Sequence, residues 1–266
     1  MASITPQPSS LAPAALIMAA GKGTRMQSDL PKVVHEVGDR PMICHVVDAC
    51  LRAGCGRVVV IVGYQQERVR RALGGYGDRL AFAVQAEQLG TGHAVQCAEP
   101  ALAGLHPATP VFVLAGDGPL IRAETLRAIL DRHVSTGASA TLATSVIGDP
   151  RGYGRIVRDA GGGFASIVEE KNASAEQLAI REVNPSYYCF GLGVLLGAIR
   201  RVGRDARSGE YYLTDVPPII MREGGRVEVI DAVPPEDVLS INTPEQLAEV
   251  DRVLRGRLAG AAEITP

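Results

Sequence analysis

Aromatic residues and an excess of one charge are both missing from this sequence. Phe, Trp and Tyr together make up 4% of its 266 residues, tryptophan is absent, and the net charge is −2. Proteins that bind nucleic acid without sequence preference use stacked aromatic side chains and a field of positive charge. We therefore expect no nucleic-acid partner, although a few local cations are enough to bind the phosphates of a small molecule.

Cysteine is scarce and irregularly spaced. The five cysteines, at positions 44, 50, 55, 97 and 189, form no Cys-x-x-Cys pair, and the five histidines form no ligand-spaced cluster. An odd number of cysteines with such spacing argues against a disulfide framework and against a zinc site. We expect reduced, buried thiols in a cytoplasmic protein.

Long hydrophobic runs are missing as well, since none approaches the roughly 20 apolar residues that a membrane span needs. Residues 11–20 are apolar, but no lysine or arginine precedes them as in a secretory signal, and they lead into a glycine-rich turn. We interpret residues 1–13 as a flexible leader before a buried strand. We expect no membrane partner.

The first half of the chain does contain short apolar runs that alternate with helical patterns. The runs are rich in β-branched residues, which is typical of strands buried on both faces. They predict strands at residues 15–19, 57–62, 80–85, 110–114 and 139–146. Helices are predicted at residues 41–53, 66–73, 92–102 and 123–133. This alternation implies right-handed crossovers and a mostly parallel sheet, which is the α/β class.

The pattern changes after residue 150. Alternating runs at residues 152–158 and 164–168 flank three glycines and predict a hairpin. Helical patterns follow at residues 210–222 and 243–257, the second of which begins with the favourable pair Thr243-Pro244.

No linker separates the two halves of the chain. We predict a single domain at residues 14–257, in which a nucleotide-binding half (14–150) and a sugar-binding half (151–257) share one sheet, followed by a tail at 258–266. In such sheets ligands bind beyond the carboxyl ends of the strands.

A glycine-rich turn follows the first predicted strand and leads to Lys32. Its small residues let the backbone approach a ligand, and its N–H groups can surround a phosphate. Arg25 offers a planar fork for phosphate oxygens and Lys32 a point charge. A dinucleotide fingerprint would need glycine where Met26 stands, and a Walker loop needs four residues between its glycines. The alternative interpretation is a tight turn with solvated cations.

The segment Gln85–Thr91 follows another predicted strand. Uracil presents carbonyls and an N3–H on one edge, and the amide of Gln85 with the bare backbone of Gly90 offers both a donor and an acceptor. The alternative is a strand end followed by a helix that Thr91 caps.

Asp117 comes at the end of a buried strand, in the sequence Ala115-Gly116-Asp117. A lone carboxylate there is costly unless something neutralises its charge. A hard cation does so, and Mg²⁺ favours one or two protein oxygens together with phosphates. A helix N-cap is the alternative role for Asp117.

Together these motifs resemble those of the sugar-nucleotide pyrophosphorylases, in particular the uridyltransferase half of bacterial N-acetylglucosamine-1-phosphate uridyltransferases. The resemblance runs from AAGKGTRMQSDLPKVVH at residues 19–35 through QAEQLGTGHAV at 85–95 and GDGPL at 116–120. It continues through GYGRIV, IVEEK, EVN, GEYYLTD and IN, at residues 152–157, 167–171, 182–184, 209–215 and 241–242. Several motifs in one order make the match specific, and it covers about residues 14–254.

The resemblance implies a Rossmann-like, three-layer nucleotidyltransferase fold with a mixed, mostly parallel central sheet. It assigns catalytic roles to Arg25 and Lys32 and a magnesium site to Asp117 and Asn242. For Asn242, a role in the turn before Thr243-Pro244 is the alternative. The nucleotide site it implies comprises Ala19, Ala20, Gly21, Gly23, Gln85, Gln88, Gly90 and Thr91. The sugar site it implies comprises Gly154, Glu169, Asn184, Tyr212 and Thr214.

Glu169 and Glu170 are adjacent on a predicted strand and face opposite sides, so only one of them can reach the sugar. The resemblance selects Glu169, and Glu170 and Lys171 are interpreted as a solvated edge. The chain departs from the family pattern at Gly118, where an apolar residue is usual, and at Pro185-Ser186 after Asn184. No hexapeptide repeat follows residue 257, so we expect no acetyltransferase activity.

The reaction that the resemblance implies joins UTP to N-acetylglucosamine 1-phosphate and releases pyrophosphate, with Mg²⁺ as cofactor. Three alternatives stay open. One is another pair of substrates, such as UTP or dTTP with glucose 1-phosphate. The second is a cytidylyltransferase, and the third is a nucleotide-sugar sensor without turnover. The sequence does not indicate an oligomeric state.

Overall fold

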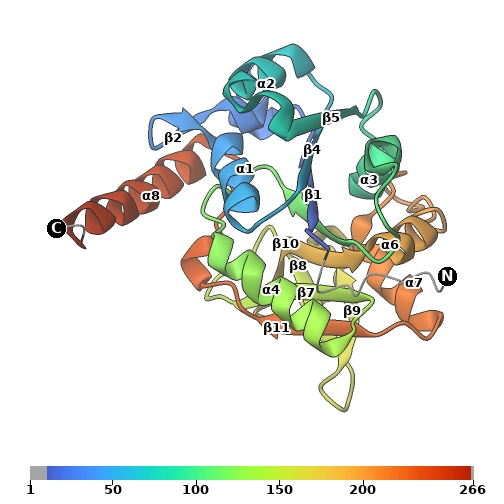
Figure 1. The fold of residues 1–266 in the computed structure, drawn as a ribbon. Helices are drawn as coiled ribbons and strands as arrows, with labels where there is room; N and C mark the ends of the chain where they lie inside the picture. Colours follow the sequence, from blue (N-terminus) through green and yellow to red (C-terminus); the bar gives the residue numbers. More distant parts are fainter. Residues whose placement is uncertain (1–10, 265–266) are drawn as a thin grey trace.

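Nine strands form one mixed sheet in the computed structural model, which describes residues 11–264 (Figure 1). The strands are β1 (Ala14–Ala19), β4 (Arg57–Val62), β5 (Leu80–Val84), β6 (Pro110–Ala115), β7 (Ala140–Val146), β8 (Gly154–Arg158), β9 (Phe164–Val168), β10 (Glu182–Gly191) and β11 (Val227–Asp231). Their order is β11-β7-β10-β6-β1-β4-β5, and the β8–β9 hairpin joins through β10. A separate ribbon pairs β2 (Glu36–Val37) with β3 (Arg40–Pro41). Residues 1–10 of the predicted leader and 265–266 of the predicted tail lie outside the described residues.

The five strands predicted in the first half are confirmed to within one residue at each end. β1 pairs in parallel with β4 and β6, and β4 pairs in parallel with β5. Along β1, Ala15, Ile17 and Ala19 pack into one core, whereas Ala14 and Leu16 pack into the other. The strand is apolar on both faces because both faces of the sheet are covered. The predicted hairpin is confirmed as β8 and β9.

β10 was not predicted as a strand, although it inserts between β6 and β7 and runs antiparallel to both. Its register shifts between Val183 and Tyr187, and Ser186 there has a φ of 64°. Pro185 lies at this irregularity, where a proline can be accommodated because a bulge frees it from the ladder. The interruption hides the alternation that would have revealed the strand.

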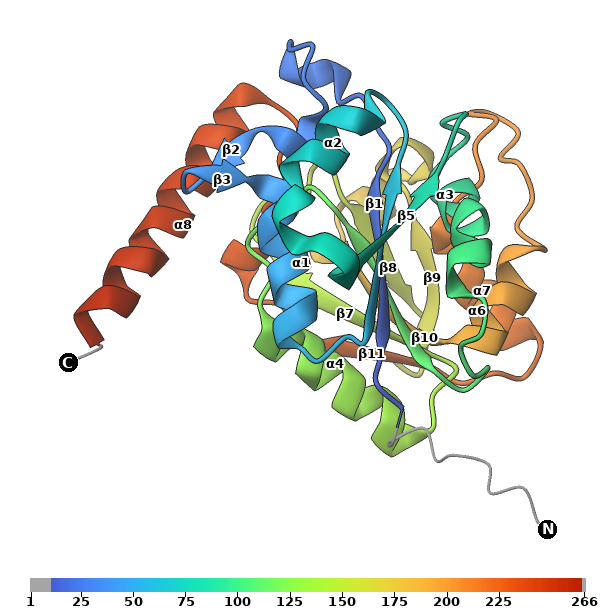
Figure 2. The same cartoon turned by 45° about the horizontal axis from the view of Figure 1, so that its top comes forward.

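Helices cover the two faces of the sheet (Figure 2). They are α1 (Met42–Arg52), α2 (Gln66–Ala72), α3 (Thr91–Ala98), α4 (Ala123–Thr136), α5 (Ala175–Leu178), α6 (Leu192–Ile199), α7 (Val216–Arg222) and α8 (Pro244–Ile264). Buried residues of α1, α2, α4 and α8 pack into one core, and those of α3, α6 and α7 pack into the other. The predicted Rossmann-like, three-layer α/β fold is therefore confirmed.

Several boundaries differ from the prediction. The helix expected at residues 92–102 becomes a 3-10 turn (Glu99–Leu102) after α3. Residues 210–212 do not begin a helix; a 3-10 turn (Leu213–Asp215) precedes α7 instead. The helix predicted to end at residue 257 is longer, because α8 continues to Ile264. The start of α8 agrees with the prediction, since Thr243 Oγ1 accepts the Gln246 N–H at 3.3 Å. α6 and β11 were not predicted.

Strands from both predicted halves share the sheet, while the assignment of one half to the nucleotide and the other to the sugar stays a prediction. All five cysteines are free thiols, and four of them are buried. Within residues 11–264, no helix combines the length and the apolar character needed to cross a membrane.

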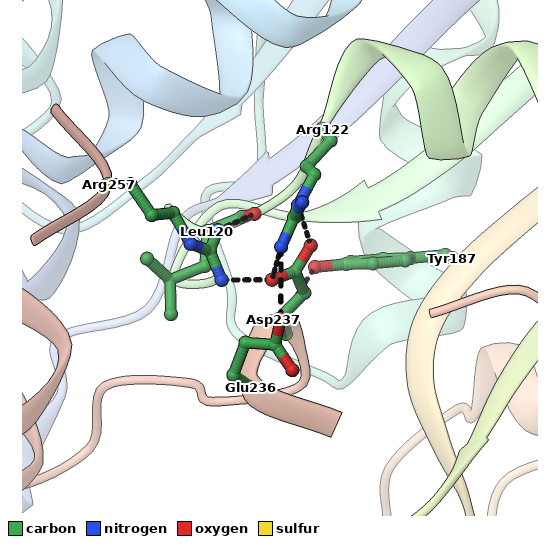
Figure 3. A network of polar contacts seen from close by, with 6 residues as sticks. All are labelled: Leu120, Arg122, Tyr187, Glu236, Asp237 and Arg257. Carbon is green, nitrogen blue, oxygen red and sulfur yellow. Dashed lines mark hydrogen bonds and ion pairs between the residues drawn. The ribbon is translucent and has the colours of Figure 1, made fainter. Parts of the chain in front are cut away.

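A buried carboxylate ties α8 to the loop that leaves β6 (Figure 3). Asp237 is 1% exposed. It accepts hydrogen bonds from Arg122 Nε at 2.5 Å, from Arg122 Nη2 at 3.0 Å, and from Arg257 of α8. Arg257 also donates to the Leu120 carbonyl at 3.1 Å, and the Tyr187 hydroxyl donates to the Asp237 carbonyl at 3.2 Å. One residue thus fixes α8, the loop after β6 and the segment that leads to Asn242.

We expect Asp237→Asn to lower the free energy of unfolding by about 2–4 kcal/mol, because asparagine has no charge to offset Arg122 and Arg257, and its NH₂ group would replace an acceptor oxygen facing a guanidinium donor. Denaturant unfolding of the two proteins measures the difference. Asp39→Asn is the matched control, since Asp39 is exposed and pairs with Arg255 on the surface. Equal losses in the two variants would contradict a structural role for Asp237.

His133 makes the stability of the fold depend on pH. It lies in α4 at 6% exposure, with Nδ1 3.1 Å from Thr141 Oγ1 of β7, and burial lowers its pKa from 6.5 to about 4. The stability contributed by neutral His133 is therefore complete above pH 6.5 and is lost as the pH falls toward 4.

We expect protonation linked to His133 to lower the free energy of unfolding by about 2 kcal/mol between pH 7 and pH 5. Denaturant unfolding at both pH values checks this. His133→Gln removes the titrating imidazole and should lose less stability on acidification, whereas the control His106→Gln retains His133 and should behave as the parent does. A His133→Gln variant that loses as much stability on acidification as the parent would contradict the assignment.

Candidate active site

A cavity of about 710 Å³ opens at the carboxyl ends of β1 and β6. The parallel neighbours β4, β1 and β6 end at the same edge of the sheet, so the loops that leave them meet there. Of the predicted site residues, all but Gly23 and Thr214 line this cavity. Gly23 and Thr214 each contact a lining residue, which is Lys32 for Gly23 and Glu169 for Thr214.

The glycine-rich turn after β1 positions Lys32. Gly23 has a φ of 74°, and a Cβ atom there would lie 2.5 Å from the Cβ of Lys32. Only glycine fits both the left-handed backbone and the close approach of the lysine. The Gly23 carbonyl accepts the Met26 N–H at 2.9 Å, and Met26 is buried, so the turn is anchored in the core.

Lys32 brings the two predicted metal ligands together. Its Nζ donates to Asp117 Oδ2 and, at 2.9 Å, to Asn242 Oδ1. These partners lie 85 and 210 residues from Lys32 in the sequence. A backbone hydrogen bond of 3.1 Å from the Ile241 N–H to the Asp117 carbonyl joins the two segments directly.

Arg25 reaches the same point. Its Nη2 donates to Asn242 Oδ1 at 2.9 Å, while the rest of the side chain is exposed. Arg25 and Lys32 thus both contact Asn242, and only Lys32 pairs with the Asp117 carboxylate, which leaves a local excess of positive charge around Asn242. Such an excess favours an anionic ligand such as a polyphosphate.

The alternative roles of the two predicted metal ligands can now be compared with the structure. Asp117 does not cap a helix, because α4 begins at Ala123. Asn242 does have a turn role, since its N–H donates to Gln246 Oε1 at 2.8 Å at the start of α8. Its side chain nevertheless faces Lys32, so the backbone and the amide have separate roles.

The donor set of Asp117 and Asn242 fits a magnesium ion. Both side-chain oxygens reach one ammonium group, so they converge on one point. Among the residues that the structure describes, no three His, Cys, Asp or Glu side chains are grouped as metal ligands. One carboxylate and one amide leave most of the coordination to substrate phosphates, as Mg²⁺ prefers. The magnesium site stays a prediction.

The predicted base-binding segment lies at the end of β5. Gln85 is 4% exposed, and its Nε2 donates to the Gly90 carbonyl at 3.0 Å. Gln88 Nε2 donates to the Gln85 carbonyl at 3.1 Å, which fixes the loop between them. Gly90 has a φ of 101°, and a Cβ atom there would lie 2.5 Å from the carbonyl oxygen of Tyr211. Glycine is therefore required at position 90.

The base-binding segment is joined to the predicted sugar-binding segment by hydrogen bonds. The Tyr211 N–H donates to the Leu89 carbonyl at 2.8 Å, and the Gly92 N–H donates to the Tyr211 carbonyl at 2.7 Å. Thr91 Oγ1 accepts the Leu213 N–H at 3.0 Å. The interpretation of Thr91 as a helix cap is wrong, because Gly90 is the N-cap of α3 and the hydroxyl serves Leu213.

Glu169 lies between the sugar-binding segments. It accepts a hydrogen bond of 3.1 Å from Thr214 Oγ1, and Thr214 is buried. Burial raises the pKa of the Glu169 carboxyl above its ordinary value, and the hydrogen bond from Thr214 opposes that shift. A desolvated carboxylate of this kind is a strong acceptor for a ligand hydroxyl.

Asn184 lies beside the bulge in β10. Its Nδ2 donates to the Tyr188 hydroxyl, and its Oδ1 accepts the Ser186 N–H at 3.2 Å. The departure at Pro185-Ser186 is thus the bulge that orients this amide, and one N–H and one lone pair remain for a ligand. Gly154 is its register partner on β8. Tyr212 lines the cavity nearby and donates to Ser208 Oγ at 2.6 Å.

The interpretation of Glu170 and Lys171 as a solvated edge holds for their exposure, which is 39% and 52% of the side chain, but it missed their contacts around the cavity. Glu170 accepts from the Gly152 N–H and pairs with the fully buried Arg155 at 3.6 Å. Lys171 Nζ lies 4.9 Å from the centroid of the Tyr212 ring. Both residues line the cavity. Period-two alternation missed them because a 3-10 turn (Glu170–Asn172) begins where the strand ends.

Tyr153 was also missed. Its hydroxyl donates to the Val238 carbonyl at 3.0 Å and accepts the Ser240 N–H at 3.3 Å. It therefore connects the loop before β8 with the segment that carries Asn242. Its place between two glycines in GYGR is the one signal in the sequence that could have identified it.

Comparisons with known proteins identify the family that the chain resembles. Residues 15–175 match the family of MobA-like NTP transferase domains. The chain is 46% identical over 244 residues to "Bifunctional protein GlmU" of Heliobacterium modesticaldum and 45% identical over 245 residues to that of Geobacter metallireducens. Each alignment covers 92% of this chain but 52% and 51% of the relative, so the chain spans about half the length of the curated relatives it matches. The predicted resemblance is confirmed.

We expect Lys32→Met to lower kcat by about 100-fold or more while changing the KM for the nucleotide only a few-fold. The ammonium group lies where charge would gather on the reacting phosphate, so its contact should strengthen in the transition state. Steady-state kinetics at several Mg²⁺ concentrations measures both parameters. Lys22→Met is the matched control, because Lys22 is an exposed lysine of the same turn that lies over the Tyr64 ring. A raised KM with an unchanged kcat would make Lys32 a ground-state contact only.

Proposed function

This chain belongs to the family of MobA-like NTP transferase domains, and we propose that it transfers UMP from UTP to N-acetylglucosamine 1-phosphate, releasing pyrophosphate. Membership in the family identifies the chain as a nucleotidyltransferase. Similarity to the GlmU proteins over 92% of the chain supports a sugar 1-phosphate as the acceptor. The observation that carries the proposal is the convergence of Arg25, Lys32, Asp117 and Asn242 beside the base- and sugar-binding segments.

In this proposal an oxygen of the sugar phosphate attacks the α-phosphorus of UTP. A new O–P bond forms as the bond between the α-phosphorus and the bridging oxygen breaks, and pyrophosphate leaves with that electron pair. A phosphate monoester is already anionic near neutral pH, so no general base is required. Catalysis then consists of positioning and charge neutralisation.

Arg25 and Lys32 would supply the neutralisation. Arg25 projects from the exposed rim, which suits a contact with the β- and γ-phosphates, and its planar fork fits their oxygens. Lys32 is deeper, next to Asp117, which suits the reacting phosphate. Asp117 and Asn242 would hold Mg²⁺, which supplies additional charge neutralisation when bound.

Two features support the choice of substrates. The amide of Gln85 and the backbone of Gly90 offer one acceptor and one donor to a base edge. Glu169 and Asn184 offer a carboxylate and an amide to the sugar, and Lys171 and Tyr212 close the same end of the cavity. A cytidylyltransferase and a sensor without turnover are the competing functions, and a kinetic panel separates all three.

The panel measures pyrophosphate release with UTP, CTP and dTTP, each against N-acetylglucosamine 1-phosphate, glucosamine 1-phosphate and glucose 1-phosphate. We expect UTP with N-acetylglucosamine 1-phosphate to give the highest kcat/KM, with discrimination against CTP of up to about 10⁴-fold, because a mismatched base would leave buried polar groups unpaired. Activity should require Mg²⁺ and disappear with a chelator.

A preference for CTP would contradict the assignment of UTP as the nucleotide. A preference for another sugar 1-phosphate would contradict only the assignment of the acceptor. Binding of UTP without turnover on any acceptor would favour the sensor. Asp117→Ala serves as the control for background pyrophosphate release, because this variant should still bind nucleotide while its turnover rate is lower by about 10²-fold or more.

A further inference from the structure

The amide of Gln85 is held from two sides by groups inside the protein. Its Nε2 lies 3.0 Å from the carbonyl oxygen of Gly90 and 3.2 Å from Nδ1 of His93 in α3. The other ring nitrogen of His93 lies 3.5 Å from Cys97 Sγ. Because Gln85 is 4% exposed, its amide has little freedom to exchange these partners for water.

The Gly90 carbonyl decides which end of the amide faces it, because a carbonyl oxygen accepts and never donates. A reversed amide would place two oxygens against each other. The second N–H of Gln85 then meets His93 Nδ1, which accepts it when the imidazole proton resides on Nε2. Both N–H groups are used, so Oε1, which has no donor among residues 11–264, is the atom left for a ligand.

The backbone N–H of Gly90 is the complementary group. It has no acceptor within the part of the chain that the structure describes, and Gly90 lines the cavity beside Gln85. An acceptor next to a donor matches the uracil edge, where the N3–H lies next to a carbonyl. Cytosine presents an unprotonated N3 next to an amino group, so both contacts would be opposed for a base held in the same position.

His93 is needed for this selection. Without its Nδ1, the second N–H of Gln85 would be buried and unpaired, which is costly, and it would turn toward any acceptor in the cavity. N3 of cytosine is such an acceptor. The histidine therefore acts on the base through the glutamine and does not touch the base itself.

We propose that His93 is a specificity-determining residue, whose Nδ1 acts together with the Gly90 carbonyl to hold both N–H groups of the Gln85 amide, so that Oε1 faces the cavity and selects pyrimidine bases with a donor at N3. This inference rests on the proposed uridylyl transfer and extends it to a residue outside the cavity lining.

The test compares His93→Leu with His93→Asn. Leucine removes the acceptor, whereas asparagine can place an oxygen near the position of Nδ1. We expect the ratio of kcat/KM for UTP to that for CTP to fall about tenfold or more in His93→Leu and to stay within a few-fold of the parent in His93→Asn. The KM for the sugar 1-phosphate should be unchanged in both. Competition binding of UTP and CTP gives the same ratio where CTP turnover is too slow.

Cys97→Ala is the matched control, because it removes the contact on the other ring nitrogen and should leave the ratio unchanged. An equal loss of activity with both nucleotides in His93→Leu would indicate a structural role and overturn the inference. A UTP-to-CTP ratio in His93→Leu equal to that of the parent would also overturn the inference about His93. The proposed function would still stand in that case, provided that the parent enzyme prefers UTP. A parent enzyme that prefers CTP would overturn the proposed function itself.

Discussion

The charge of Asp117 is the constraint on which the arrangement of the site depends. The carboxylate stands at the carboxyl end of a buried strand, in a partly desolvated position, and an isolated charge there would be costly. Lys32 neutralises it, and the same ammonium group binds Asn242. Because these three residues come from the turn after β1, from the end of β6 and from the start of α8, neutralising one charge brings the first and last parts of the chain together.

The segments that meet at Asp117 are fixed by groups farther away. Asp237 is locked by Arg122 and Arg257, so the loop after β6 and the segment before Asn242 are anchored at one buried point (Figure 3). Tyr153 holds the same segment from the side of the predicted sugar site. An amide oxygen and a carboxylate oxygen are thereby held at hydrogen-bonding distance from one atom before any ligand binds, which is the preorganisation that electrostatic catalysis needs.

Local sequence patterns predicted the first half of the fold well, because parallel strands buried on both faces are continuous apolar runs. β1, β4 and β6 needed no knowledge of their neighbours. β10 could not be found in this way, since Pro185 and the positive φ of Ser186 break its alternation. What makes it a strand is its position between β6 and β7, a tertiary fact that no local window contains.

The residues of the candidate site likewise differ in how far the sequence could identify them. Lys32 and Asp117 were singled out because each follows a buried strand and a glycine, and the resemblance assigned their roles; the structure places both beside the cavity. The roles of Glu170, Tyr153 and His93 were not predicted, because each acts through a partner distant in the sequence or through the orientation of another side chain. Hydrogen-bond polarity, as at Gln85, depends on which atom faces which, and a sequence records only that an amide is present.

The cavity is lined by cations and carboxylates that come from both predicted halves of the chain. Arg25 and Lys32 contact Asn242, whereas Glu169, Glu170 and Lys171 follow β9, where burial raises the pKa of Glu169 and the charge of Lys171 opposes that shift. In the proposed function, Arg25 and Lys32 would attract phosphate groups, and the buried carboxylate of Glu169 would accept hydrogen bonds from sugar hydroxyl groups. The backbone bridge through Tyr211 joins the base-binding and sugar-binding segments, so the two ligands would be oriented by one connected framework.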